Sequence, residues 1–182
     1  MSEQAAVREA VAEDIEAALA LWTTSHVVRR NGRPLPEAHI ASAHQRMAAP
    51  GALLLLARCP GDADAAGQAE GAPDVAREVV GTVLGVQGLD RDGAGPPVPG
   101  LLHISLLSVA PERWGQHIGR QLVEQVLARA SLRGYEQAQL WTHADNLRAN
   151  RLYKSLGFRR SGRVKIDDWG ELLVHYRRAV RH

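Results

Sequence analysis

The chain has 182 residues, of which 45% are hydrophobic and 23% are charged. This length suits one domain, and the composition can bury a core, so the chain as a whole does not read as disordered. A net charge of +2 and an aromatic content of 4% argue against a basic, aromatic-rich nucleic-acid surface. The single cysteine, Cys59, excludes a disulfide framework and a thiolate metal cluster within one chain.

The N-terminal stretch MSEQAAVREA lacks the charged-then-apolar pattern of a signal peptide. No apolar run approaches the ~20 residues that a membrane helix needs. A lone thiol fits a reducing compartment. We therefore expect a soluble, cytoplasmic protein that binds neither membrane nor nucleic acid.

The first half of the chain alternates between helical and extended patterns. Ile15, Leu19 and Trp22 recur at i, i+4 and i+7, which is typical of one helix face. Glycine and two prolines in RNGRPLP then interrupt the pattern. In chain order, the sequence predicts a strand (5–10), a helix (12–28), a second helix (36–49), a buried strand (51–59), a mobile loop (60–76), a partner strand (77–88) and a proline-stiffened loop (89–100).

The second half begins with an apolar run over Leu101–Val109, which predicts a central strand. After a glycine-containing turn, apolar residues share a helix face, and Gly134 is placed to cap that helix. The face consists of Ile118, Leu122, Val126 and Ala130. The remaining predictions are a strand (138–144), an amphipathic helix (145–156) capped by Gly157, and a terminal hairpin (158–166 and 171–178).

The resulting order is β-α-α-β-β-β-α-β-α-β-β. A strand–helix–strand unit in the middle pairs its strands in parallel, and the flanking hairpins pair theirs antiparallel. The sequence therefore predicts an α/β (α+β) protein with one domain over residues 1–182. Its sheet is mixed and mostly antiparallel, with about seven strands and about four helices.

The segment VAPERWGQHIGRQL (109–122) places two glycines at the junction between a strand and a helix. A helix N-terminus offers unpaired backbone N–H groups and a partial positive charge to an anion. Gly115 and Gly119 would allow a ligand to approach the backbone, and Arg113 and Arg120 would add cations. The alternative is a tight turn in which the glycines serve geometry alone. The segment lacks the Gly-Lys-Ser/Thr ending of a Walker loop and the spacing of a dinucleotide fingerprint.

The same segment resembles the acyl-CoA turn of the GCN5-related N-acetyltransferase (GNAT) family, Arg/Gln-x-x-Gly-x-Gly/Ala at a helix start. NLRANRLYKSLGF (146–158) resembles the family's later motif, Asn-x-x-Ala-x-x-Leu-Tyr-x-x-x-Gly-Phe. The matching residues are Asn146, Ala149, Leu152, Tyr153, Gly157 and Phe158. Both motifs lie in the family's order, and the order of elements agrees across nearly the whole chain.

The turn departs from the family pattern at two positions. Trp114 stands where Arg or Gln is usual, and His117 stands where the first glycine is usual. Backbone N–H donation survives any side chain except that of proline. Cofactor binding at this turn therefore depends on whether His117 can adopt the required φ/ψ. The alternative is that its imidazole helps to neutralise phosphate.

The resemblance implies that two parallel strands, 101–109 and 138–144, splay apart and hold the pantetheine arm of acetyl-CoA between them. It also implies that an N–H near 107–109 polarises the thioester carbonyl. The implied cofactor-binding residues are Leu107, Ser108, Val109, Trp114, Gly115, Gln116, His117, Ile118, Gly119, Arg120, Asn146 and Tyr153. Asn146 also suits a helix N-cap, and both roles are compatible.

The activity implied by the resemblance is transfer of an acetyl group from acetyl-CoA to a primary amine, by direct attack in a ternary complex. Tyr153 matches the family tyrosine that protonates the leaving thiolate; the alternative is a core aromatic. For the base we predict His103, which uninterrupted alternation places on one strand face with Ser105, Leu107 and Val109. A buried, hydrogen-bonded histidine is the alternative reading of His103, and His143 is a second candidate for the base.

We expect no metal site, because His39 and His44 are five residues apart and miss the i, i+4 spacing. The acceptor, a small-molecule or peptide amine, should enter past residues 21–47, the loop 90–100 and the hairpin at 167–169. Asp167 and Asp168 could attract a cationic amine there, or form a solvated turn. The rival hypotheses are a non-catalytic acyl-CoA-binding module and a nucleic-acid adapter. The terminal strand could also pair across a homodimer.

Overall fold

The computed structural model describes residues 5–60 and 77–180. These residues form a seven-stranded sheet in the order β1-β2-β3-β4-β5-β7-β6. Its strands are β1 Ala6–Glu9, β2 Leu53–Pro60, β3 Arg77–Leu89, β4 Pro97–Val109, β5 Gln137–His143, β6 Arg159–Ile166 and β7 Leu172–Ala179. The β4–β5 pair is parallel and the other pairs are antiparallel, which confirms the predicted mixed sheet.

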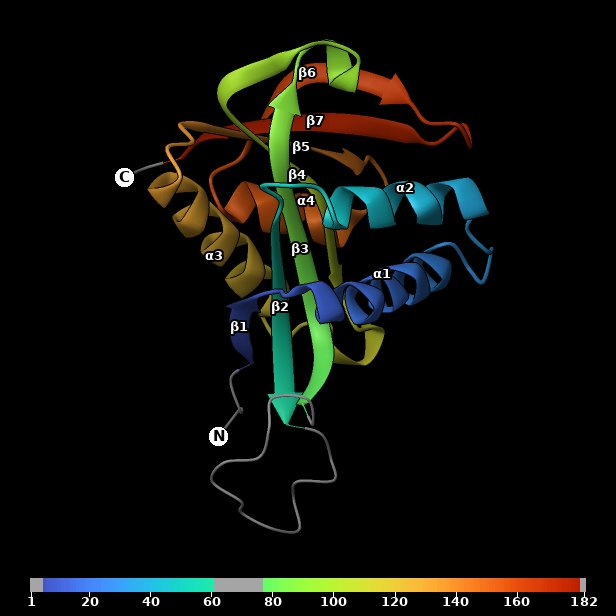
Figure 1. Cartoon of the computed structure of the whole chain (residues 1–182). Coiled ribbons are helices and arrows are strands. Elements are labelled where there is room, and N and C mark those ends of the chain that lie inside the picture. The colour runs from blue at the N-terminus through green and yellow to red at the C-terminus, as the bar shows by residue number, and fades with distance from the viewer. Residues whose placement is uncertain (1–4, 61–76, 181–182) are drawn as a thin grey trace.

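Two helices lie on each side of this sheet. The helices are α1 Ile15–Arg29, α2 Glu37–Met47, α3 Ile118–Leu132 and α4 Leu147–Ser155. In Figure 1, α1 and α2 lie across the central strands from α3. None of the described helices is long and apolar enough to span a bilayer.

The two sides of the sheet carry separate hydrophobic cores. The core under α3 and α4 contains the predicted α3 face, and all four residues of that face are buried. The core under α1 and α2 centres on Trp22, Met47, Leu54 and Leu84. Gly134 has a φ of +82°, and the N–H of Tyr135 bonds to the carbonyl of Ala130. Gly134 therefore ends α3 in the left-handed conformation expected of a C-terminal cap.

Some boundaries differ from the predictions. The first helix starts at Ile15, because Ala12–Asp14 forms a 3₁₀ turn in which the buried Asp14 bonds to Arg8 and Arg58. Strand β4 begins at Pro97 rather than at Leu101, since proline is tolerated at the first residue of a strand. Apart from residue 60, the loop predicted over 60–76 lies outside the described residues.

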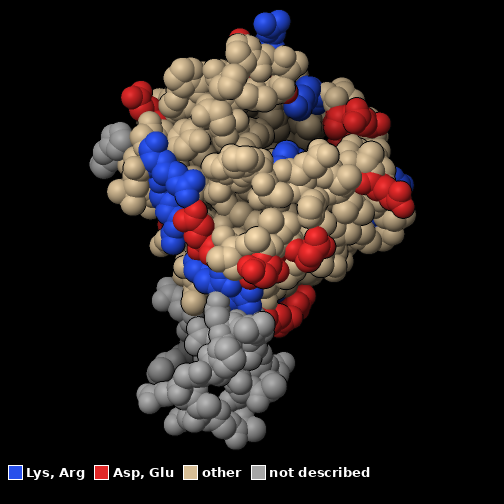
Figure 2. Space-filling view, viewed as in Figure 1, with Lys and Arg blue, Asp and Glu red and all other residues tan. Residues whose placement is uncertain are grey.

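The face drawn in Figure 2 mixes charges of both signs. Short groups of basic side chains adjoin acidic ones around an uncharged middle. This face therefore offers no continuous basic stripe of the kind that follows a nucleic-acid backbone.

Candidate active site

The two parallel strands separate partway along their length. Their pairing ends at Ile104 and Leu140, whereas β4 continues to Val109 and β5 to His143. A cavity of about 800 Å³ opens between the separated ends. Its volume is typical of small-molecule and cofactor sites. The splayed pair that the family resemblance implied is therefore present.

A β-bulge in β4 lies where the strands separate. Leu106 pairs with Leu84 and Ile104 pairs with Gly85, so Ser105 has no partner along the described strand β3. An extra residue of this kind reverses the alternation of the side chains. Accordingly, Ile104 packs in the core under α3, whereas Leu106 packs in the core under α1 and α2.

The bulge overturns the predicted strand face. Uninterrupted alternation would put His103, Ser105, Leu107 and Val109 together, but Leu107 and Val109 pack against the α3 core, as Ile104 does. His103, next to Ile104, therefore points to the opposite face. The prediction failed because period-two alternation holds only while every residue has a partner in the ladder.

The glycine turn leaves a run of backbone donors at the start of α3. Gly115 and His117 have φ values of +83° and +62°. The first helical hydrogen bond runs from the N–H of Gln121 to the carbonyl of His117 at 3.0 Å. Within the described residues, the N–H groups of residues 115–120 have no backbone or side-chain acceptor. The turn is thus built as an anion site of the type found at helix N-termini.

Cationic side chains line the cavity on this side. Arg113, Arg120, Arg148 and Arg151 all contribute to its wall. The guanidinium of Arg148 lies 3.9 Å from the ring centroid of Trp114. The four arginines thus give this wall of the cavity a positive potential.

Trp114 has a structural role besides lining the cavity. Its Nε1 donates to the carbonyl of Val109 at 2.9 Å, which ties the turn to the end of β4. The N–H of Ala110 bonds to Val80 of β3. Because consecutive residues of a strand alternate, Val109 and Leu107 direct their backbone N–H groups away from β3, toward the gap.

Helix α4 supplies two of the predicted site residues. Asn146 is its N-cap, and its Oδ1 accepts from the N–H of Ala149 at 3.2 Å. Tyr153 is only 6% exposed, yet it lines the cavity. Its hydroxyl has no hydrogen-bond partner among the described residues. Burial raises the pKa of Tyr153, so its phenol stays protonated.

His103 sits in a different environment. Burial, followed by the charges of Arg46, Lys165 and His175, lowers the pKa of His103 to about 4. Its Nδ1 is buried and has no hydrogen-bond partner within residues 5–60 and 77–180, and His103 is not among the residues lining the cavity. His103 is therefore neutral at pH 7 and a weak proton acceptor.

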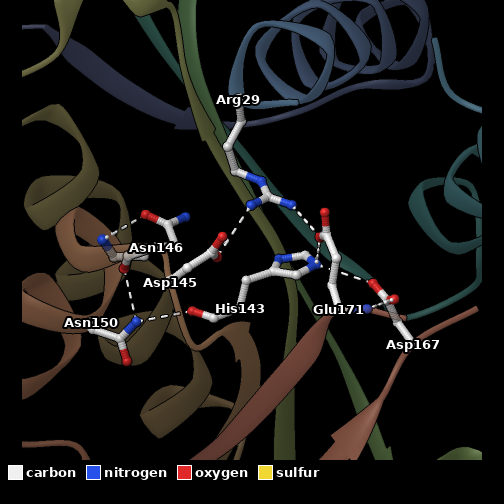
Figure 3. A network of polar contacts seen from close by, with 8 residues as sticks. Arg29, His143, Asp145, Asn146, Asn150, Asp167 and Glu171 are labelled. Carbon is white, nitrogen blue, oxygen red and sulfur yellow. Dashed lines mark hydrogen bonds and ion pairs between the residues drawn. The ribbon is translucent and has the colours of Figure 1, made fainter. Parts of the chain in front are cut away.

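His143, at the end of β5, lies in a polar network (Figure 3). Its Nε2 is 3.2 Å from Oδ2 of Asp167 and 2.9 Å from Oε2 of Glu171. Arg29 of α1 bonds to the same Glu171 oxygen at 2.8 Å. The buried Asn150 donates to the carbonyl of His143 at 3.0 Å. Helix α1, helix α4 and the turn between β6 and β7 therefore hold the His143 ring in place, although they lie far apart in the sequence.

The two acids that contact His143 are ionised. Burial alone would raise the pKa of Asp167, but the N–H groups of Glu171 and Trp169 and the His143 ring outweigh it and lower the pKa. Burial acts against ionisation of Glu171 as well, and Arg29 together with His143 lowers its pKa. Paired carboxylates on Nε2 favour the tautomer with its proton there, which leaves the lone pair on Nδ1.

The predicted site residues fall into two groups. The cavity lining brings together Leu107, Ser108, Val109, Trp114, Gly115, His117, Ile118, Gly119, Arg120, Asn146 and Tyr153. Gln116 and His103 are not part of it. Asp167 joins the lining, whereas the Asp168 side chain is 88% exposed beside His39. Sequence reasoning missed Arg29 and Glu171, which no local motif marks.

The network could also be read as a metal site. One ligand atom each from His143, Asp167 and Glu171 lies within 4.8 Å of the others. The Arg29 guanidinium already contacts the Glu171 oxygen, however, and its positive charge would repel a metal cation bound beside it. The donors are therefore better explained as a hydrogen-bonded, ion-paired cluster.

Comparison with known proteins identifies the family. The model of the acetyltransferase (GNAT) family matches residues 60–158. The chain therefore belongs to the acetyltransferase (GNAT) family.

Individual relatives are distant. N-acetyltransferase 8B of Homo sapiens is 38% identical over 79 residues, which is 41% of this chain and 35% of that protein. The chain spans 12% and 35% of the lengths of the curated relatives that it matches.

Solved structures share the fold across the whole chain. The ribosomal-protein-S18-alanine N-acetyltransferase of Escherichia coli has a TM-score of 0.66 at 17% identity, covering 98% of this chain and 95% of its own. The PaiA N-acetyltransferase of Thermoplasma acidophilum, in complex with coenzyme A, has a TM-score of 0.58 at 16% identity, covering 96% and 98%. These similarities define the fold.

Proposed function

We propose that the protein is an acetyl-CoA-dependent N-acetyltransferase that acetylates a primary amine by direct attack in a ternary complex. One observation carries the proposal: a single cavity connects the free N–H groups before α3 with Tyr153 and His143. Family membership supports the reaction class. Acetyl-CoA would supply the acetyl group as an activated thioester.

The chain's own groups fit this cosubstrate. The N–H groups of residues 115–120 suit a diphosphate, because a helix N-terminus combines free donors with a partial positive charge. The arginines of the cavity wall add complementary charge. Farther along the cavity, the N–H groups of Leu107 and Val109 would hold the extended pantetheine arm as an added strand does.

The acceptor must lose a proton to react. A lysine-like amine has a pKa near 10.4, so roughly one molecule in a thousand is neutral at pH 7. We assign the role of proton acceptor to His143, directly or through one water, because it lines the cavity and keeps a lone pair on Nδ1. His103, the first candidate from the sequence, is not part of this wall, and burial lowers its pKa.

Tyr153 is positioned to complete proton transfer. Tyr153 lines the cavity, and its hydroxyl has no partner among the described residues, so we propose that it donates to the departing sulfur. The pKa of Tyr153 is raised by burial, which keeps the donor proton in place. We therefore assign to Tyr153 the role of the acid.

The acceptor would enter on the side of α1 and α2. Trp22, His26 and His39 line the cavity there, together with Asp167 and Trp169 from the terminal hairpin. Two of the three parts of the entry route expected from the sequence, residues 21–47 and the hairpin at 167–169, contribute to this lining, whereas the loop 90–100 does not. The E. coli neighbour takes a ribosomal protein, as its name says, but 17% identity carries no acceptor over to this chain.

The test combines binding with turnover. Acetyl-CoA affinity is measured by calorimetry, and release of the CoA thiol is followed with amino acids, polyamines, aminoglycosides and peptide N-termini as acceptors. The proposal expects saturable binding and acceptor-dependent thiol release, with the acetylated amine found by mass spectrometry. Tight binding without turnover on any acceptor would instead identify a non-catalytic acyl-CoA-binding module.

A further inference from the structure

Arg46 is a cationic residue of the cavity that the reaction does not use. It lies in the last turn of α2, and its half-buried side chain reaches the bulge of β4. Its Nη1 donates to Oγ of Ser105 at 2.5 Å, and its Nε donates to the carbonyl of Ser42 at 3.2 Å. Nη2 has no partner among the described residues. One edge of the guanidinium is therefore available at the point where β4 and β5 separate.

The charge of Arg46 is not balanced by the protein. No carboxylate among the described residues lies within ion-pair distance of Arg46, whereas Arg29 is paired with both Glu171 and Asp145. Of the described residues that line the cavity, Asp167 is the one acid, and it already contacts His143. Burial lowers the pKa of Arg46, which is the direction expected for a cation without a counter-charge.

We infer that the amine acceptor also carries a carboxylate, and that Arg46 binds this carboxylate while His143 faces the amine. The inference rests on the proposed function and narrows its substrate to small molecules of the amino-acid class. A carboxylate would use the free edge of the guanidinium, whose fork of donors matches its two oxygens. It would also supply the missing counter-charge beside the bulge.

A purely structural role is the rival explanation. If Arg46 only supports the bulge through Ser105, its loss would lower kcat/KM by the same factor for every acceptor. Three variants separate these roles. Ser105→Ala removes the brace and keeps the charge, whereas Arg46→Gln removes the charge and keeps a polar side chain. Arg46→Lys keeps the charge without the fork.

The experiment uses acceptors in matched sets of three: an amino acid, its carboxamide and its decarboxylated amine. In the wild type, kcat/KM should favour the carboxylate over both analogues by about 10- to 100-fold, the usual worth of a hydrogen-bonded ion pair. Arg46→Gln should reduce this preference to less than about threefold, chiefly through KM. Ser105→Ala should keep the preference, and Arg46→Lys should keep part of it.

Several outcomes would overturn the inference. Equal kcat/KM for all three acceptors in the wild type would show that the protein does not recognise the acceptor's carboxylate. A uniform loss across the three acceptors in Arg46→Gln would show that the residue only supports the fold.

A failure of the proposed function is recognised separately. If no amine were acetylated, that function would fall, and Arg46 would be judged by binding alone. In the presence of CoA, N-acetyl amino acids should raise the melting temperature of the wild type but not of Arg46→Gln. N-acetyl amino acid amides should raise the melting temperature of neither protein. Equal shifts of the wild type and Arg46→Gln with N-acetyl amino acids would refute the carboxylate site.

Discussion

Gly115 and His117, two residues apart at the start of α3, both hold left-handed backbone conformations, with φ values of +83° and +62°. Glycine adopts this region freely, whereas a histidine there is strained. Gly119, by contrast, is helical, and a Cβ there would make only ordinary contacts with Leu152 and Val109. The turn thus contains one unstrained left-handed residue, Gly115, and one strained left-handed residue, His117.

Replacing His117 by glycine should release the strain. We expect His117→Gly to raise the free energy of unfolding by up to about 1 kcal/mol, and the melting temperature by about 2–4 °C. Acetyl-CoA affinity should change less than about threefold, because the N–H group remains. Calorimetric unfolding checks this, with His117→Ala as the control that keeps the strain. A lower melting temperature for His117→Gly than for the wild type would contradict it.

Tyr153→Phe should lower kcat by about 100-fold, within the range of general acid catalysis, and leave acetyl-CoA affinity nearly unchanged. Its hydroxyl has no partner among the described residues, so stability should also be retained. The matched control is Tyr176→Phe. In the wild type, the hydroxyl of Tyr176 donates to Oδ1 of Asn150 at 2.7 Å. That control should lose about 1 kcal/mol of stability. An undiminished rate in Tyr153→Phe would remove Tyr153 as the acid.

His143→Gln should reduce kcat/KM by about 100-fold at pH 7, while His103→Gln should reduce it less than about fivefold. The difference follows from their positions, since only His143 lines the cavity. Steady-state kinetics of both variants on the best acceptor checks this. The reverse order of losses would restore His103 as the base.

Much of this fold follows from local patterns. The buried face of α3 and its end at Gly134 are set by helical periodicity and a glycine that can adopt positive φ. The two motifs around Gly119 and Tyr153 marked the cavity, because each is a short run of sequence.

The parts that sequence reasoning missed depend on three-dimensional pairing. The bulge at Ser105 arises from how β4 pairs with β3, and nothing in LLHISLLSV marks the residue without a partner. The ion pair between Arg29 and Glu171 joins residues 142 positions apart. Only the folded chain shows why His143 is held in place and His103 is turned away.

Stability should fall as the pH drops from 7.5 to 5. Burial, followed by nearby cations, lowers the pKa of His26, His103 and His175 to about 4 from the ordinary 6.5. Between these values the unfolded chain binds more protons than the folded chain, so acid favours unfolding. Hydrogen bonds and neighbouring cations lower the pKa of Asp167 and of Glu171 against the effect of burial, so both carboxylates stay ionised through this window.

Urea unfolding at the two pH values measures this effect. Each histidine should contribute on the order of 1–2 kcal/mol to the loss at pH 5. His103→Gln should shrink the difference between the two pH values by that amount. An unchanged difference would show that His103 titrates normally in the folded protein.

The central claim, that the turn before α3 binds the diphosphate of acetyl-CoA, is tested most directly by calorimetric titration of Gly119 variants. A side chain at Gly119 would point toward Leu152 and Val109 of the cavity wall, where a Cβ would sit 3.4 and 3.7 Å from their nearest atoms. Gly119→Ala should therefore bind acetyl-CoA within about fivefold of the wild type. Gly119→Glu should bind at least about 100-fold more weakly, with its melting temperature nearly unchanged, because a carboxylate repels the diphosphate. Wild-type affinity in Gly119→Glu would place the cosubstrate elsewhere and contradict the account.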